Sequence, residues 1–232
     1  MEELKVIARI CNDYTSKFGI PRQSGLVPEQ TAEIVFEPEY RDANALRGLE
    51  DYSYIWLIWG FSEVHQEKWS PMVKPPRLGG NTRMGVFATR SPNRPNPIGL
   101  SCVALVGVET KPGSGTVLRV AGADLMNGSP IYDIKPYLSQ TECHPEAKNG
   151  FSEKNFDHRL EVVFPPELIA GVPQEKRRAL IAALALDPRP AYQEDPAMPY
   201  GFLYAGLDVR FRVAQGVLTV FDVANEGDER LK

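Results

Sequence analysis

The residues best suited to chemistry in this 232-residue chain lie in one segment, from Arg77 to Ser101. Two glycines precede a strand-like stretch flanked by Arg83 and Arg90, and a proline-rich loop, Ser91 to Pro97, follows it. Each proline fixes φ near −65° and restricts the residue before it, so the loop holds its Asn and Arg side chains at low conformational entropy. Pre-organised groups of this kind suit the recognition of a polar ligand. A rigid structural turn between two strands is the alternative.

The charge of this region has the opposite sign to that of the whole chain. The formal net charge is −4, which by itself argues against an RNA partner. Between Lys68 and Val108, however, the sequence has six basic residues and no Asp or Glu, so the rest of the chain carries −10. A local positive field is what binding a phosphate or a carboxylate requires, and a solvated basic face is the other explanation. The six are Lys68, Lys74, Arg77, Arg83, Arg90 and Arg94.

A second polar group follows a predicted strand, from Asp124 to Tyr137. Asp, Asn, Gly and Ser are common in turns, so the stretch 124–129 is either a structural turn or a place where a carboxylate and backbone amides hold a polar ligand. Asp133, Lys135 and Tyr137 alternate along the next strand and share one face. The His and Cys residues have no metal-ligand spacing, and the motifs of Rossmann and P-loop sites are missing. We therefore expect no metal site.

Short strands with few helices must position these groups. Hydrophobic alternation and turn residues at near-regular spacing are typical of an antiparallel sheet or barrel rather than of βαβ units. One helix is expected among these strands, at Ala43–Leu49 with Asp42 as its cap. The sequence predicts strands at Leu4–Ile10, Ala32–Phe36, Ser53–Phe61, Met84–Thr89, Ile98–Val108, Thr116–Ala121 and Ile131–Lys135.

A polar, irregular stretch at residues 138–157 predicts a boundary between domains at 1–140 and 158–232. The second unit is expected to have a strand at His158–Phe164, an amphipathic helix at Gln174–Leu186 and a hairpin around Gln215-Gly216. The expected fold is thus mainly β: an antiparallel barrel-like domain and a small α+β C-terminal domain. We find no apolar run of the roughly 20 residues that span a bilayer and no signal-like N-terminus, which favours the cytoplasm.

Several of these stretches resemble the signature of the TrmO family, and the resemblance covers essentially the whole chain. It implies an S-adenosylmethionine-dependent methyltransferase acting on N6 of threonylcarbamoyladenosine at tRNA position 37. It also implies that the barrel-like domain binds the cofactor, that the anticodon loop of tRNA is the partner, and that two copies form a homodimer with the cofactor near the interface. The matching runs are residues 21–27, 47–50, 75–81, 85–91, 94–99, 133–137 and 187–192.

The resemblance also implies which residues contact the cofactor. Two positions depart from the family pattern. Ser62 and Glu63 stand where a His-Gln pair usually contacts the cofactor, with His65-Gln66 three residues later, and Asn127 stands where Asp is common. By position, the expected cofactor contacts are Ser24, Gly25, Leu26, Arg90, Leu100, Asp124, Leu125, Met126 and Asn127, with Ser62 and Glu63 at the altered site.

The mechanism we expect is direct methyl transfer from the sulfonium to nitrogen, with catalysis mainly from proximity and orientation. Our hypothesis is that Asp133, or the amides of Asn93 and Asn96, accepts a hydrogen bond from the N6 proton. Two other functions remain open: a non-catalytic RNA-binding barrel, and a methyltransferase for another nucleoside or a small molecule. Beyond Arg90, the residues expected to contact the substrate are Arg77, Arg83, Arg94, Lys135, Tyr137 and Arg189; we expect the C-terminal domain to help position tRNA.

Overall fold

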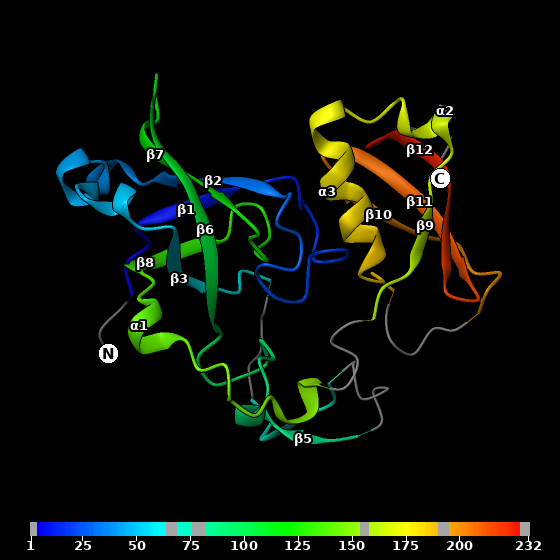
Figure 1. Cartoon of the computed structure of the whole chain (residues 1–232), viewed down its shortest axis with the longest axis horizontal. Coiled ribbons are helices and arrows are strands. Elements are labelled where there is room, and N and C mark those ends of the chain that lie inside the picture. Colours follow the sequence, from blue (N-terminus) through cyan, green and yellow to red (C-terminus); the bar gives the residue numbers. More distant parts are fainter. Residues whose placement is uncertain (1–3, 64–68, 76–81, 154–157, 190–194, 228–232) are drawn as a thin grey trace.

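A computed structural model describes residues 4–63, 69–75, 82–153, 158–189 and 195–227. Its N-terminal part is a closed antiparallel barrel with strand order β1-β2-β7-β6-β3-β8, and its C-terminal part is a smaller unit beside it (Figure 1). The prediction of a mainly β fold with a barrel-like first domain is confirmed. The barrel strands are β1 (Ala8–Cys11), β2 (Thr31–Phe36), β3 (Tyr54–Gly60), β6 (Ile98–Lys111), β7 (Gly115–Ala121) and β8 (Pro130–Pro136).

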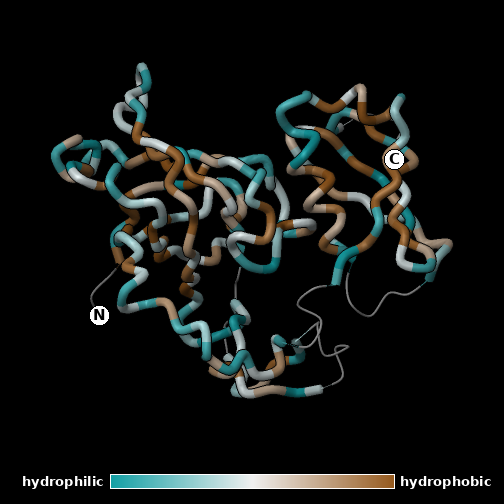
Figure 2. The backbone as a smooth tube through the Cα atoms, in the orientation of Figure 1, coloured by the Kyte–Doolittle hydropathy of each residue, from teal (hydrophilic) through white to brown (hydrophobic). Residues whose placement is uncertain are grey.

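Alternation along the strands fills the barrel with apolar side chains, and Figure 2 shows the hydrophobic colour following these strands. On β3, Ile55, Leu57 and Trp59 point inward and are at most 5% exposed, while the residues between them face outward. The register pairs Trp59 with Gly99 of β6 and Ile58 with Leu100. Because side chains alternate across a strand, neighbours in sequence here lie on opposite faces of the barrel wall.

The C-terminal unit is a four-stranded sheet in the order β10-β11-β12-β9, covered by helix α3. The expected helix and hairpin are present, with Gln215 and Gly216 at φ 49° and 80° in the tight turn that joins β11 to β12. Strand β10 was not predicted from the sequence. The elements are β9 (Glu161–Val163), α2 (Pro166–Ile169), α3 (Gln174–Ala185), β10 (Tyr200–Tyr204), β11 (Leu207–Ala214) and β12 (Val217–Asn225).

The long connection between β1 and β2 packs against the C-terminal unit. Tyr14 and Val27 belong to the same buried cluster as the α3 and β10–β12 side chains. Polar contacts cross here as well: Lys176 Nζ lies 2.6 Å from Asp13 Oδ2, and the Tyr204 hydroxyl donates to Gln30 Oε1 at 2.6 Å. The C-terminal unit therefore forms part of the core that holds residues 14–30 in place.

Two local predictions were wrong. The expected helix at 43–49 consists of two short 3-10 turns, η2 (Ala43–Leu46), where Asp42 does cap Asn44 N, and η3 (Leu49–Asp51). Gly48 between them is at φ 84°, which an α-helix does not allow. The strand expected at 84–89 is only β5 (Met84–Gly85), paired with β4 (Met72–Val73), and it passes into η5 (Val86–Ala88). The remaining short elements are η1 (Pro38–Tyr40), α1 (Ser139–Glu142) and η6 (Gly150–Glu153). Across the described ranges, none of the helices has the length and apolar character to cross a membrane.

Candidate functional site

A carboxylate at one end of the barrel is the centre of the candidate site. Asp124 follows β7, and its Oδ1 accepts a hydrogen bond from the Ser101 hydroxyl at 2.5 Å. The Ser101 oxygen in turn accepts from Trp59 Nε1 at 2.9 Å. Ser101 and Trp59 point into the barrel from β6 and β3 and are almost fully buried. This chain of hydrogen bonds, which we call the Asp124 cluster, fixes the carboxylate while leaving it partly exposed.

The surroundings of Asp124 act on its protonation in opposite directions. Burial raises the pKa of the carboxyl above its ordinary value, because the charged form loses water. The Ser101 hydroxyl, the backbone amides of Asp124 and Ser24, and the positive charge of Arg90 all lower the pKa, but less than burial raises it. A carboxylate destabilised in this way gains from a nearby positive group, so the site is suited to a cationic ligand.

Two glycines bring the loop at residues 23–26 close to the Asp124 cluster. Gly25 N donates to Gly122 O at 2.8 Å, and a Cβ on Gly122 would lie 3.2 Å from the Gly25 Cα. Gly25 is at φ 79°, and no atom lies within 4 Å of the place where its own Cβ would stand. An open space of carbon size thus borders exposed backbone, with Ser24 and Leu26 half-buried on either side.

Arg90 connects this loop to the proline-rich loop. Its NH1 donates to Gln23 Oε1 at 2.5 Å, and its side chain is otherwise exposed. Arg94 NH1 donates to the Thr89 carbonyl at 3.1 Å, so this side chain holds the loop together instead of extending from it. Asn93 and Asn96 are exposed. The loop is therefore an ordered support for Arg90, as the prolines predicted.

A second set of predicted residues lies on the outer wall of the barrel. Asp133 and Lys135 do share one face of β8, with Tyr137 directly after its last residue, and Lys135 Nζ lies 2.9 Å from Asp133 Oδ2. Tyr137 packs edge-on against Trp56, with ring centroids 5.9 Å apart. Leu100 is on the same outer face and is 50% exposed. The structure therefore separates this set from the Asp124 cluster by the thickness of the barrel wall.

The remaining predicted residues have different surroundings. Leu125 is fully buried in the barrel core, so only its backbone is available to a ligand. Asn127 Oδ1 accepts from Asn12 N at 3.0 Å, and Met126 is half-buried. Ser62, Glu63 and Arg83 are exposed. Arg77, like His65 and Gln66, lies outside the described residues.

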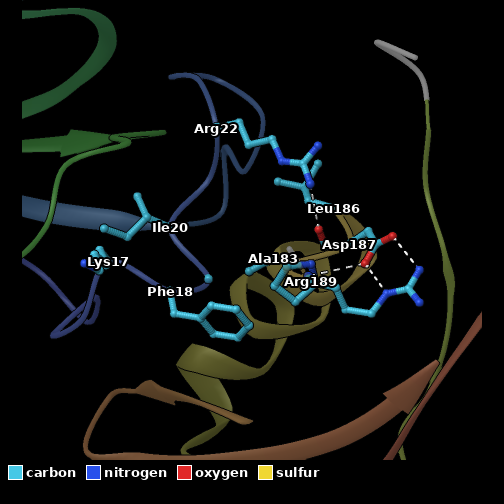
Figure 3. A pocket seen from close by; sticks show the side chains of 10 residues that line it. Lys17, Phe18, Ile20, Arg22, Ala183, Leu186, Asp187 and Arg189 are labelled. Atoms are coloured by element: carbon cyan, nitrogen blue, oxygen red, sulfur yellow. Dashed lines mark hydrogen bonds and ion pairs between the residues drawn. The ribbon is translucent and has the colours of Figure 1, made fainter. Parts of the chain in front are cut away.

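Arg189 borders a pocket of about 220 Å³ between the β1–β2 connection and the end of α3 (Figure 3). Its guanidinium makes two hydrogen bonds to Asp187, at 2.8 and 2.9 Å, and Arg22 donates to the Asp187 carbonyl at 3.1 Å. Burial alone raises the pKa of Asp187, but the hydrogen bonds and charge of Arg189 together bring it below its ordinary value. Arg189 thus contributes to this local ion pair, and its role toward tRNA stays a prediction.

Ser101, Trp59 and Gln23 belong to the site but were not among the site residues predicted from the sequence. A signal was present for Ser101, because a hydroxyl at an inward position between Gly99 and Val103 interrupts an otherwise apolar face. Trp59 looks like any core aromatic in the sequence. Only the tertiary structure brings its indole N–H to the serine that contacts Asp124.

Comparison with known proteins matches both parts of this architecture. Residues 9–143 match the tRNA-methyltransferase O N-terminal domain, and residues 157–226 match the TrmO C-terminal domain. The chain belongs to the TrmO family. The barrel from the second residue of β1 onward, with its Asp124 cluster, lies within the first match, and the sheet with α3 lies within the second.

Individual relatives are similar to this chain along most of its length. A tRNA (adenine(37)-N6)-methyltransferase of Escherichia coli is 39% identical over 94% of this chain and 96% of its own length. A Pseudomonas aeruginosa protein described as an S-adenosylmethionine-dependent methyltransferase is 35% identical over 94% of this chain and 96% of its own. A crystal structure of TrmO from Pseudomonas aeruginosa superposes with a TM-score of 0.78 at 29% identity, covering 97% of this chain and all of that one.

Proposed function

We infer that this chain is an S-adenosylmethionine-dependent methyltransferase that modifies N6 of adenosine 37 in tRNA. The observation that carries this function is the Asp124 cluster, a fixed and partly exposed carboxylate beside open glycine backbone, in a chain that matches the family over both domains. Within that activity, we propose that the acceptor is the threonylcarbamoyl derivative of the adenosine, presented by the anticodon loop. We propose that the reaction takes place in the cytoplasm.

The residues around Asp124 fit the cofactor. S-adenosylmethionine carries a sulfonium whose methyl group is the one transferred. Asp124 supplies the negative charge that such a cation favours, the exposed Arg90 offers hydrogen-bond donors, and the open space at Gly25 leaves room for the ligand beside them. We propose that these residues, with Leu26, Met126 and the backbone of the 124–127 turn, bind and orient the cofactor. Ser62 and Glu63, exposed at the end of β3, stay proposed contacts.

For the acceptor, we propose that Asp133 or the exposed amides of Asn93 and Asn96 accept a hydrogen bond from the N6 proton. Because Asp133 lies on the outer wall of the barrel, it can do so only where a second copy brings this wall to its own cofactor site. Asp133 Oδ1 already accepts from Ile134 N at 2.9 Å, which fixes the carboxylate, and Lys135 lies against Oδ2. We propose that Arg83, Lys135 and Tyr137 contact the threonyl carboxylate or the RNA. Arg90 adds positive charge beside Gln23 and Asp124, next to the residues proposed for the cofactor.

We also propose a homodimer with the cofactor near its interface. The outer wall formed by β3 and β6 carries exposed apolar side chains: Tyr54 is 49%, Ile98 38%, Leu100 50% and Val106 45% exposed. Several exposed apolar side chains on one wall of a folded chain are typical of a subunit interface. Leu100, a proposed cofactor residue, lies on this wall and not with the Asp124 cluster, which supports a cofactor site completed by a second copy.

Ile98→Asp tests the dimer. A charge buried without a partner in an interface costs about 2–5 kcal/mol, so we expect the dimer to dissociate at least tenfold more readily in sedimentation velocity. Val163→Asp, at a similarly exposed apolar residue of β9, should leave the dimer intact. If Ile98→Asp sediments as the wild type does, the β3–β6 wall is not the interface.

Methyl transfer is tested with purified chain, S-adenosylmethionine and tRNA that carries threonylcarbamoyladenosine. We expect mass spectrometry of the digested tRNA to show a methylated threonylcarbamoyladenosine peak, and Asp133→Asn to reduce its rate roughly 100-fold if that carboxylate acts as a general base. Cofactor binding with no such peak would assign another acceptor. Binding of RNA but not of cofactor would leave an RNA-binding barrel instead.

A further inference from the structure

Two exposed aromatic rings flank the two-stranded ribbon of β4 and β5: Trp69 precedes β4, and Phe87 follows β5 in η5. Trp69 is 50% exposed and Phe87 is 72% exposed, yet the two rings stack on each other with centroids 6.2 Å apart and 29° between their planes. Met72, beside them in the ribbon, is 45% exposed. We call Trp69 and Phe87 the aromatic platform. In Figure 1 the ribbon with β5 extends from the barrel on the side away from β7.

Hydrogen bonds connect the Phe87 side of the platform to Arg90. Val86, next to Phe87, is 1% exposed, and its N–H donates to Pro71 O at 2.9 Å. The Thr89 hydroxyl donates to Val86 O at 2.8 Å, and Arg94 binds the Thr89 carbonyl. Arg90 follows directly, and its charge acts on Asp124. A group stacked on Phe87 is therefore tied through a short, hydrogen-bonded stretch to the proposed cofactor site.

The charge around the platform favours one kind of occupant. Lys74, Arg83 and Arg90 are exposed nearby in sequence, and no Asp or Glu occurs between residues 68 and 108. Proteins that bind single-stranded nucleic acid use flat aromatic faces next to positive charge, because the bases stack on the rings and the basic side chains contact the phosphates. A contact between two such ribbons of a dimer would instead bring like charges together.

We propose that the aromatic platform stacks an unpaired base of the tRNA anticodon loop, next to the adenosine that is methylated. This rests on the proposed function, but concerns a contact with the RNA that is separate from the cofactor and from methyl transfer. Stacking on one aromatic side chain contributes about 1–3 kcal/mol per base. Its role is to position the loop so that the target base reaches the cofactor site.

The test measures RNA binding without any methyl transfer. The probe is an anticodon stem–loop RNA with 2-aminopurine beside adenosine 37, titrated with the full chain in the absence of cofactor. We expect fluorescence quenching on binding to the wild type, and roughly 5- to 100-fold weaker binding with less quenching for Phe87→Leu and Trp69→Leu. Phe87→Tyr keeps a ring and should retain both. Tyr52→Leu, at an aromatic residue that is 38% exposed before β3, is the matched control.

Each result of this experiment either supports or contradicts a direct contact between the platform and RNA. Wild-type affinity and quenching in Phe87→Leu would overturn it, as would a shift of Phe87→Leu from dimer to monomer in sedimentation, which would assign the platform to a second copy. Unchanged cofactor affinity in the weakened variants supports a direct contact with RNA. If Phe87→Leu loses affinity and quenching but the wild type methylates no tRNA, the platform stands and the proposed activity fails.

Discussion

Replacing Asp124 by Asn is expected to weaken S-adenosylmethionine binding roughly 10- to 100-fold. The amide keeps the size of the side chain but removes a charge, and hydrogen bonds and contacts that involve a charged group contribute about 1.5–3 kcal/mol. S-adenosylhomocysteine lacks the sulfonium charge, so its affinity should fall much less. Titration calorimetry with both ligands measures the difference. An equal loss for the two ligands would show that Asp124 does not act through its charge.

The same variant gives a pH test with a defined sign. Because burial raises the pKa of Asp124, the carboxylate becomes protonated at a higher pH than an ordinary carboxyl as the solution is acidified. Wild-type affinity for S-adenosylmethionine should therefore begin to fall above the ordinary carboxyl range, and Asp124→Asn should lack this step. Asp208→Asn, which changes a partly buried carboxylate paired with Arg210 in the C-terminal unit, should bind as the wild type does.

Folding stability should respond to Asp124 in the corresponding direction. A raised pKa in the folded state means that the folded chain holds the proton more tightly than the unfolded chain, so stability from this group is lost as pH rises through the raised pKa. The free energy of unfolding of the wild type, relative to that of Asp124→Asn, should therefore increase as the pH falls from neutral toward the ordinary carboxyl range. Urea denaturation at several pH values measures this.

Gly99→Ala is expected to destabilise the fold by about 2–4 kcal/mol and to weaken cofactor binding as well. A Cβ at Gly99 would lie 2.2 Å from Trp59 Cε2 and 2.6 Å from its Nε1. Trp59 is 5% exposed and packs against Phe61 at 4.3 Å, so the ring has little room to move. Overpacking costs about 1–3 kcal/mol and the lost Trp59–Ser101 hydrogen bond about 1 kcal/mol more.

Gly107→Ala is the matched control, because it lies on the same strand and no atom lies within 4 Å of its Cβ position. Chemical denaturation should show little change for this variant, or a slight gain from the lower entropy of the unfolded chain. Equal stability of Gly99→Ala and the wild type would mean that Trp59 can move aside. If Gly99→Ala is destabilised but binds cofactor normally, the Trp59–Ser101 bond does not position Asp124.

The sequence by itself determined the features that depend on short-range patterns. Short strands at near-regular spacing, with turns between them and few helices, indicated the barrel. The helix at 174–186 and the Gln215-Gly216 hairpin followed from local periodicity and turn chemistry. The prolines of 92–97 predicted an ordered loop, and the segment without acidic residues indicated a positive region hidden by the net charge of −4. The 43–49 helix failed because Gly48 requires a positive φ.

The tertiary structure decided which polar groups meet. Strand register places Leu100 and Asp133 on the outer wall while Ser101 and Trp59 point inward, so residues that looked like one site divide between two faces. The partners of Asp124 come from β3, β6 and the 23–26 loop, and their approach depends on barrel closure, which no local pattern encodes. The packing of residues 14–30 against the C-terminal unit is likewise a long-range contact. Propensity and periodicity act within a few residues, whereas the electrostatics of a site depend on groups brought together from distant parts of the chain.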